Sequence, residues 1–397
     1  MRRFHLIAIA SALIVTLAAP CQAGVDTSAE HAILIDADSG QILWAKDAFA
    51  PMPPASMSKL MTLELLFQRL KDGRLKLSDT LGVSQRAWSE RGGSEMFVNI
   101  GDKISVEDLI RGIIVMSAND GCIVVAEGIG GTVENFVSMM NARARQLGLA
   151  QSHFVNPNGL PQPPGQLMSA ADLAKLARHL IVDYPAYYHY FAERNFVWSN
   201  IPQENRNLVL EKFPGADGLK TGHTDAAGYG ITTSAVHDGE RLILVLNGLR
   251  YPDLAKRDSK SQDWFAEQRR ADEAARILGI AFREFHRYQL FRPGDIVGKA
   301  VVWQGGSDTV PLKLAGALDV TMPVDSRAGM KLTLNYDGPV QAPVAKDQQV
   351  GTLKITAPDF PGLVVPVYAV NSVGSAGFFA RIFLGLRALI SPNSAGR

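Results

Sequence analysis

Residues 53–62, PPASMSKLMT, open a largely apolar run and place a serine three positions before a lysine. Proline suits the entry to a helix, so Pro53 and Pro54 predict a helix that begins near Ala55 or Ser56. Gly73 is a natural stop for this helix. The apolar positions are numerous enough to predict that the helix is buried; they are Met57, Leu60, Met61, Leu63, Leu65, Leu66 and Leu70.

Ser56 and Lys59 would share one face at the start of this helix, because residues three apart on a helix lie side by side. A lysine among so many apolar neighbours is unusual, since burial of an unpaired ammonium is costly. Two interpretations remain open on this stretch alone. The pair is either a capping serine with a surface lysine, or a serine with a base beside it, and the choice requires partners elsewhere in the chain.

The overall composition sets bounds but gives little direction. A chain of 397 residues with 47% hydrophobic content is long enough for two or three domains, each with its own core. The 40 basic and 39 acidic residues give a formal net charge of +1, which does not indicate a nucleic-acid partner. Two cysteines cannot form a disulfide scaffold, and we expect Cys122 to be a small buried hydrophobic residue.

Residues 1–23 have the features of a signal peptide. A basic start, MRRFH, precedes the apolar stretch LIAIASALIVTLAA, and small residues stand at Cys21 and Ala23. We expect cleavage after Ala23 and export of the mature chain. An uncleaved anchor is the alternative, but the apolar stretch is shorter than the roughly 20 residues that span a bilayer. Lipoprotein cleavage before Cys21 is disfavoured by Pro20.

The segment 24–280 predicts one α+β domain. Strand-like alternation occurs at both of its ends, and helical periodicity dominates between them. Strands from both ends around a helical insertion predict an antiparallel sheet with a helical subdomain. The expected elements are hairpins at 31–46 and 228–248, helices with capping-box spacings at Ser105 and Ser169, a helix at 132–148 and a closing helix at 263–278.

The remaining residues predict two further parts. Residues 281–373 contain short alternating segments separated by turn residues, which favour a small all-β C-terminal domain that serves as a spacer or interaction module. In 374–397, the stretch 376–390 places its large apolar residues on one helical face, with Arg381 and Arg387 as its charges. This pattern suits an amphipathic helix at a membrane surface, and a helix docked on the domain core is the alternative.

Two more short motifs contain chemically useful side chains. Ser117 and Asn119, in GIIVMSANDGC, end an apolar helix at a place where a turn would expose them. The second motif lies just before the later hairpin and consists of Lys220, Thr221, Gly222 and His223. A cation and a hydroxyl along an edge strand suit an anionic ligand, and a glycine lets a substrate approach the backbone. Either motif alone could be an ordinary helix or strand end.

In this order, Ser-x-x-Lys, Ser-x-Asn and Lys-Thr-Gly form the signature set of penicillin-binding proteins and class A β-lactamases. The chain resembles the low-molecular-mass penicillin-binding proteins that are D-alanyl-D-alanine carboxypeptidases of the bacterial cell wall. The resemblance extends beyond the triplets and covers nearly the whole chain, including the leader, the β-rich domain and the terminal helix. It rests on PASMSKLMT, MSANDGC, NPNGL at 156–160 and GLKTGHTDAAGYG.

The resemblance implies a serine nucleophile with a lysine base. Ser56 would form the ester, because a serine hydroxyl needs an adjacent base to react at neutral pH. Lys59 can be that base only if burial or a neighbouring cation, such as Lys220, favours its neutral amine. Ser117 would relay a proton toward the departing D-alanine.

The same resemblance implies the substrate-binding roles. Asn119 would hold the peptide amide, while Lys220 and Thr221 would bind the terminal carboxylate. The backbone N–H groups of Ser56 and His223 would stabilise the oxyanion. The alternative for His223 is a role as base.

Arg250 and Arg206 are further candidate partners for the carboxylate, and a surface role is the alternative for each. No cofactor and no metal are expected.

The expected activity is removal of the terminal D-alanine from peptidoglycan pentapeptide stems, with β-lactams as covalent inhibitors, at the periplasmic face of a bacterial inner membrane. Three alternatives stay open: an endopeptidase that cuts crosslinks, a β-lactamase and a non-catalytic wall-binding scaffold. Class A β-lactamases hydrolyse their acyl-enzyme with the help of a glutamate. The segment HFVNPNGLPQPPGQLMS, residues 153–169, contains no acidic residue, and the first one after it is Asp172, which argues against a β-lactamase. The intact motifs argue against the scaffold.

Overall fold

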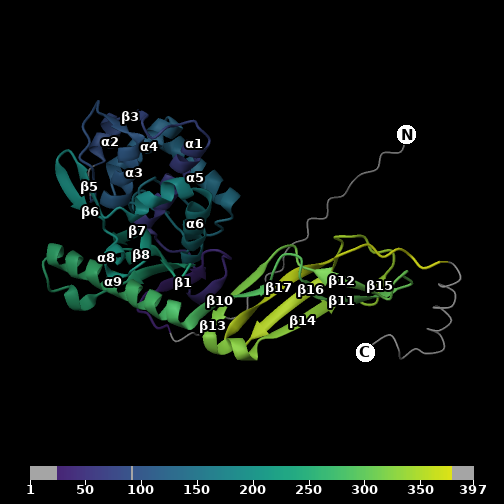
Figure 1. The fold of residues 1–397 in the computed structure, drawn as a ribbon. Helices are drawn as coiled ribbons and strands as arrows, with labels where there is room; N and C mark the ends of the chain where they lie inside the picture. Colours follow the sequence, from purple (N-terminus) through teal and green to yellow (C-terminus); the bar gives the residue numbers. More distant parts are fainter. Residues whose placement is uncertain (1–24, 91–92, 378–397) are drawn as a thin grey trace, which may run out of the picture. The chain divides into compact units, whose positions relative to one another are not determined.

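The computed structural model describes residues 25–90 and 93–377 (Figure 1). These residues form two compact units. The larger unit contains residues 25–292 and 317–325, and the smaller unit contains 293–316 and the residues from 326 onward. The predicted signal peptide and all of the predicted amphipathic tail beyond residue 377 lie outside the described residues.

A five-stranded antiparallel sheet forms the centre of the larger unit, in the order β2-β1-β9-β8-β7. Two strands come from the start of the chain and three from residues 216–249, so the predicted assembly of one sheet from both ends is confirmed. β7 stands at the edge of the sheet and pairs on one side only. The strands are β1 (His31–Asp36), β2 (Ile42–Lys46), β7 (Ala216–Thr224), β8 (Gly228–His237) and β9 (Glu240–Leu249).

Helices cover both faces of this sheet (Figure 1). The predicted helical subdomain lies on one face, where α6 packs on β1 and β9, and α9 packs on β8 and β9 from the other face. The helical elements are η1 (Ala55–Ser58), α1 (Lys59–Lys71), α2 (Gln85–Ser89), α3 (Val106–Arg111), η2 (Gly112–Met116), α4 (Asn119–Gly130), α5 (Val133–Leu147), α6 (Ala170–Asp183), α7 (Pro185–Tyr188), η3 (His189–Ala192), α8 (Val209–Lys212), η4 (Pro252–Leu254) and α9 (Ser259–Glu284). Short strand pairs are β3 (Thr80–Gly82) with β4 (Lys103–Ser105), and β5 (Asn195–Trp198) with β6 (Ile201–Glu204).

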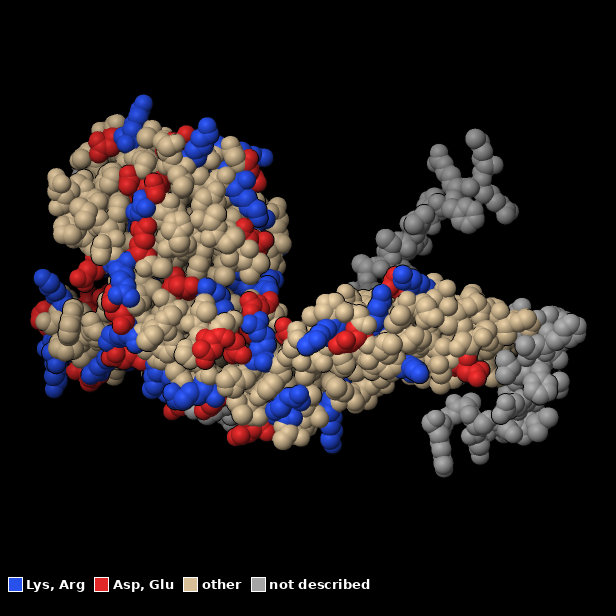
Figure 2. Space-filling view, viewed as in Figure 1, with Lys and Arg blue, Asp and Glu red and all other residues tan. Residues whose placement is uncertain are grey.

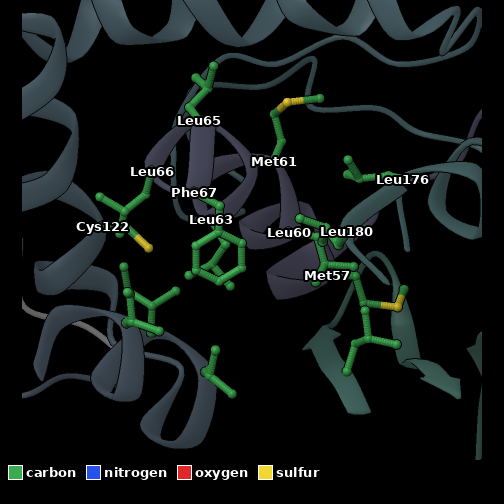
Figure 3. Packing of buried hydrophobic residues seen from close by; sticks show 14 of the residues in the cluster. Met57, Leu60, Met61, Leu63, Leu65, Leu66, Phe67, Cys122, Leu176 and Leu180 are labelled. Atoms are coloured by element: carbon green, nitrogen blue, oxygen red, sulfur yellow. The ribbon is translucent and has the colours of Figure 1, made fainter. Parts of the chain in front are cut away.

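The helix predicted from residues 53–73 is confirmed and lies at the centre of the core between the sheet and the helical layer. Its first turn is the 3₁₀ turn η1, and α1 continues from it. Figure 3 shows side chains of both elements packed with those of α4 and α6. Phe67 is fully buried and its ring stacks on Tyr187 at a centroid distance of 5.4 Å. Burial of such a side chain stabilises the fold by roughly 2–3 kcal/mol.

The predicted helix caps are present, and one helix is longer than predicted. Ser105 Oγ and Ser169 Oγ accept hydrogen bonds from the third residue of the helices that they cap, at 3.0 Å in both cases. The closing helix starts before residue 263, because Asp258 caps it by accepting a 3.0 Å hydrogen bond from Ser261 N. In the described part of the chain no single helix is long and apolar enough to cross a membrane, and only α4 with α5 meets that test together, across an 83° bend.

The smaller unit is built from strands, which confirms the all-β prediction. Its six-stranded sheet has the order β14-β16-β17-β12-β11-β15, and β11 with β15 is the parallel pair. On the face seen in Figure 2 its charged side chains are sparse. β10 pairs with β13 inside the larger unit, where Thr321 Oγ1 donates a 2.8 Å hydrogen bond to Asp36 Oδ2. The strands are β10 (Phe285–Phe291), β11 (Ile296–Trp303), β12 (Thr309–Lys313), β13 (Leu318–Pro323), β14 (Lys331–Tyr336), β15 (Val340–Gln341), β16 (Gln349–Ala357) and β17 (Phe360–Ala369), with η5 (Val324–Gly329) after β13.

Candidate active site

Ser56 and Lys59 meet at the junction of η1 and α1. The amine Nζ of Lys59 lies 2.7 Å from Ser56 Oγ. Lys59 is fully buried, whereas Ser56 is partly exposed and can be reached from solvent. The structure therefore brings together the predicted serine and lysine, with the hydroxyl on the accessible side and the amine on the buried side.

A loop that contains Asn158 fixes the other side of the lysine. Lys59 Nζ lies 2.5 Å from the carbonyl oxygen of Asn158, and Thr62 Oγ1 donates a 2.6 Å hydrogen bond to Pro157 O. Gly159 has φ +82°, and a Cβ at this position would lie 2.1 Å from the carbonyl oxygen of Ala55. Only a glycine permits this contact between the loop and η1. NPNGL, residues 156–160, contributed to the family resemblance, but the sequence predicted no role for this loop.

The environment of Lys59 favours its neutral form. Burial is the first cause and lowers its pKa to about 8, and the nearby guanidinium of Arg206 lowers the pKa further. Cys122 and Asp120 act in the opposite direction. Burial was one of the two causes expected, and Arg206 is a cation that acts on Lys59. Lys59 and Lys220 also repel each other, and this repulsion contributes to the lowered pKa of Lys220.

The Lys-Thr-Gly motif lies on the edge strand β7, against η1. Lys220 and Thr221 are buried, and Lys220 Nζ donates a 3.1 Å hydrogen bond to Thr221 O. Burial lowers the pKa of Lys220 well below its usual value, and the positive charges of Lys59, Arg206 and Arg270 lower it further. A Cβ on Gly222 would lie 2.9 Å from Pro54 O. The glycine thus allows β7 to reach the turn that carries the serine.

The Ser-x-Asn motif connects η2 to α4. Ser117 is buried with φ +60°, a left-handed conformation that costs free energy for a serine and that clusters at functional sites. Asn119 is buried at the start of α4, and its N–H donates a 2.8 Å hydrogen bond to Ser94 O. The next residue, Asp120, accepts hydrogen bonds from the backbone N–H groups of Met96 and Val98.

His223 lies on the opposite face of β7 from Gly222, because side chains alternate along a strand. Gly222 faces η1, so the imidazole lies on the side of α9, where its Nδ1 is 3.8 Å from Asp263 Oδ1. Burial lowers the pKa of His223, and the negative charge of Asp263 partly offsets this effect.

Arg250 contacts the turn between β7 and β8. Its guanidinium donates hydrogen bonds to Glu30 Oε1, Asp225 O and Ala226 O, at 3.0 to 3.1 Å. These contacts hold the turn in place. A role for Arg250 in carboxylate binding stays a prediction.

Two arginines meet beside β7, and one of them was missed from the sequence. Arg206 Nε donates a 3.3 Å hydrogen bond to Met116 O, next to Ser117. Arg270, on α9, is 2% exposed, and one of its terminal nitrogens donates a 3.2 Å hydrogen bond to Arg206 O. Its Nε has no hydrogen-bond partner among the described residues. The helical spacing of Arg270 from Ala266, Ala274 and Ile277 was a signal that it faces the core.

Cys122 is fully buried among apolar side chains near Leu66 (Figure 3), as predicted. Burial raises the pKa of its thiol to about 12, so the thiol stays protonated near neutral pH. Among the described residues no group of three or more His, Cys, Asp or Glu is arranged to hold a metal ion.

Comparison with known families gives matches over both units. Residues 16–249 match the model of the D-alanyl-D-alanine carboxypeptidase family, and residues 285–375 match that of the C-terminal domain of penicillin-binding protein 5. The D-alanyl-D-alanine carboxypeptidase DacD of Escherichia coli is 35% identical over 357 residues, which cover 88% of this chain and 88% of the relative.

Solved structures agree with these matches. Penicillin-binding protein 5 from Haemophilus influenzae has a TM-score of 0.76 and 31% identity, and the match covers 88% of this chain and 98% of that chain. Penicillin-binding protein D2 from Listeria monocytogenes, in its cefotaxime-bound form, has a TM-score of 0.56 and 25% identity, over 65% of this chain and 98% of that chain.

Proposed function

We propose that this chain, which belongs to the D-alanyl-D-alanine carboxypeptidase family, removes the terminal D-alanine of peptidoglycan stem peptides through an acyl-enzyme on Ser56. It is a serine-type carboxypeptidase with the fold of the penicillin-binding proteins. The observation that carries the assignment of the nucleophile is the 2.7 Å contact between Ser56 Oγ and the buried amine of Lys59.

Acylation begins with the neutral amine of Lys59. This amine donates one N–H to Asn158 O and directs its lone pair at the Ser56 hydroxyl, so both contacts are satisfied without a positive charge. Lys59 takes the hydroxyl proton as Oγ attacks the carbonyl carbon of the penultimate D-alanine. The backbone N–H groups of Ser56 and His223 stabilise the oxyanion.

Collapse of the oxyanion breaks the carbon–nitrogen bond of the peptide. The proton on Lys59 passes through the Ser117 hydroxyl to the leaving nitrogen, and free D-alanine departs. A water molecule then attacks the ester, with Lys59 again as the base, and restores the Ser56 hydroxyl. The shortened stem peptide leaves with the new carboxylate.

The terminal carboxylate of the substrate binds beside Lys220, Thr221 and Arg270. The positive charges of Lys59, Arg206 and Arg270 lower the pKa of Lys220. A carboxylate favours the charged form of Lys220 and leaves Lys59 as the neutral lysine. We therefore expect the enzyme to require a substrate with a free C-terminus.

β-Lactams would acylate the same serine, as the cefotaxime complex of the Listeria monocytogenes relative suggests. A long-lived adduct is expected, because the loop beside Lys59 offers the carbonyl of Asn158 and not the carboxylate with which class A β-lactamases activate water. Many turnovers of penicillin per second, without a stable adduct, would exclude the carboxypeptidase assignment in favour of a β-lactamase.

Mass spectrometry after incubation with penicillin tests the nucleophile. We expect one adduct, on the peptide that contains Ser56, and its loss in S56A together with the loss of D-alanine release from a pentapeptide. Ser58→Ala is the matched control, because Ser58 is in the same turn but its buried hydroxyl donates to Ala55 O at 3.0 Å. An adduct on any other residue would overturn the mechanism.

A proposal for the location of the enzyme rests on two sequence segments, residues 1–23 and 376–390. We propose export by residues 1–23 and attachment to the outer face of a bacterial inner membrane through the amphipathic stretch 376–390. A chain that ends at residue 375 should move from the membrane fraction to the soluble fraction. Phe383→Asp, on the apolar face of the helix predicted from the sequence, should have the same effect, whereas Ser391→Asp should not. Retention of all variants in the membrane fraction would contradict the anchor.

A further inference from the structure

The imidazole of His223 is held by a cross-strand neighbour. His223 on β7 pairs with Tyr229 on β8, and their rings are parallel, with a centroid distance of 3.7 Å and an interplanar angle of 6°. The His223 side chain is 35% exposed, so it rests on Tyr229 at the surface and is not enclosed by the core. This stacking can hold the imidazole in place only if the supporting Tyr229 ring is itself fixed.

Asp263 fixes that supporting ring. The hydroxyl of Tyr229 donates a 2.6 Å hydrogen bond to Asp263 Oδ1, on the second turn of α9. Burial, together with the negative charge of Asp263, raises the pKa of Tyr229, so the phenol keeps its proton and remains a donor over the working pH range. Tyr229 is 6% exposed, which leaves its ring little freedom once the hydroxyl is bound.

We propose that Asp263 and Tyr229 are positioning residues for His223, which hold its imidazole on the α9 side of β7 and keep the unpaired edge of this strand clear for the acyl donor. The proposal rests on the proposed function, in which the backbone N–H of His223 is one of the two oxyanion donors. A His223 ring that left Tyr229 would lie over that donor and over the carboxylate position at Thr221.

The charges around His223 indicate whether Asp263 acts by positioning the imidazole or by a direct charge interaction with it. At neutral pH the imidazole is uncharged, because burial lowers its pKa, and Asp263 therefore acts through the hydroxyl of Tyr229 and not through an ion pair. The Nδ1 to Oδ1 distance of 3.8 Å is too long for a hydrogen bond. The charged groups that act on the imidazole are Asp263, Glu267 and Arg270 from α9 and Asp225 from the turn after β7.

Glu267 provides the matched control. It lies one helical turn after Asp263 on α9 and also raises the pKa of His223, but no hydrogen bond joins it to Tyr229 among those that the structure describes. Glu267→Gln and Asp263→Asn each remove one negative charge near the imidazole. Asp263→Asn also weakens the contact that fixes Tyr229, and Tyr229→Phe removes it while keeping the stacked ring.

Stopped-flow acylation of the full mature chain with a fluorescent penicillin tests the proposal. We expect Y229F and D263N to lower the first-order acylation rate roughly 3- to 10-fold at pH 8, the range for loss of one orienting hydrogen bond, with little change in the initial binding constant. E267Q should match the wild type, D263E should restore part of the rate, and the double variant should be no slower than either single variant.

Two outcomes would overturn the proposal: equal rates in wild type, Y229F and D263N, or a rate in E267Q as low as that in D263N. NMR titration of His223 should show a lower pKa in both D263N and E267Q, which confirms that the control removes a comparable charge. Asp263 is half exposed, so D263N and D263E should fold. These two variants therefore keep the proposal testable even if Y229F does not fold. A failure of the proposed function looks different, because no protein in the series would then form the Ser56 adduct.

Discussion

Lys59 Nζ lies 2.5 Å from the carbonyl oxygen of Asn158, on the far side of the amine from Ser56. A carbonyl accepts a hydrogen bond but brings no negative charge, so it orients the amine without the stabilisation of an ammonium that a carboxylate would provide. This contact lets a fully buried lysine keep its lone pair for the serine.

The first prediction concerns the pH dependence of acylation. The pKa of Lys59 is lowered to about 8, so the fraction of neutral amine increases as the pH rises through 8. We expect the second-order rate of acylation by penicillin to increase about tenfold per pH unit below 8 and to level off above it. Lys59→Arg, which stays protonated at all these pH values, should be slower by about 10²- to 10⁴-fold. A flat profile between pH 6 and pH 9 would contradict a lysine base.

The second prediction concerns the loop that orients the lysine. Gly159→Ala should slow acylation by about tenfold or more and lower the melting temperature, because a Cβ there would lie 2.1 Å from Ala55 O at φ +82°. Gly165→Ala is the control, since Gly165 also has a positive φ, +112°, but its Cβ would meet nothing closer than 3.6 Å. Equal acylation rates for the two variants would show that backbone strain at a positive φ, and not the contact with η1, causes the loss of rate.

The third prediction concerns the carboxylate subsite. Arg270→Gln should lower kcat/KM for a peptide with a free C-terminus by about 10- to 100-fold, because it removes a buried positive charge that acts on Lys220. Arg269→Gln changes the neighbouring residue, which is 44% exposed and paired with Asp253, and should leave kcat/KM unchanged. Equal losses in the two variants would assign the effect to the stability of α9.

The fourth prediction concerns the core around α1. Phe67→Ala should lower the free energy of unfolding by about 3–5 kcal/mol, since it removes a fully buried ring that packs against Tyr187 and Phe191. Phe49→Ala, at a position that is 51% exposed, should cost far less. Denaturant unfolding followed by circular dichroism measures both. A small loss for Phe67→Ala would mean that the surrounding helices collapse into the cavity.

Much of the fold followed from local patterns in the sequence. Alternation marked the hairpin strands of the larger unit, and the caps at Ser105 and Ser169 marked two helix starts. The first four residues of α9 were missed because SKSQ, residues 259–262, contains no apolar residue, and the cap at Asp258 was the signal for the earlier start. The grouping of β10 and β13 with the larger unit depends on contacts such as Thr321 with Asp36, between residues far apart in the chain.

The site was predictable where it depends on side chains in short motifs. Ser56 and Lys59 were found because their spacing is fixed by the helix that contains them. Asn158 was missed as a partner of the lysine because it contributes a backbone carbonyl, which every residue has. Arg270 was missed because its burial depends on how α9 packs on the sheet, and Arg269 beside it in the sequence is exposed.

The position of β7 at the end of the sheet has a consequence for solubility. An unpaired strand edge is a template for association with another chain, and proteins commonly protect such edges with a bulge, a proline or a covering loop. If the acyl donor binds along the edge at Gly222 and His223, that part of β7 must stay open and cannot be protected in these ways. A covalently bound penicillin would cover it, so the acylated enzyme should resist aggregation longer than the free enzyme.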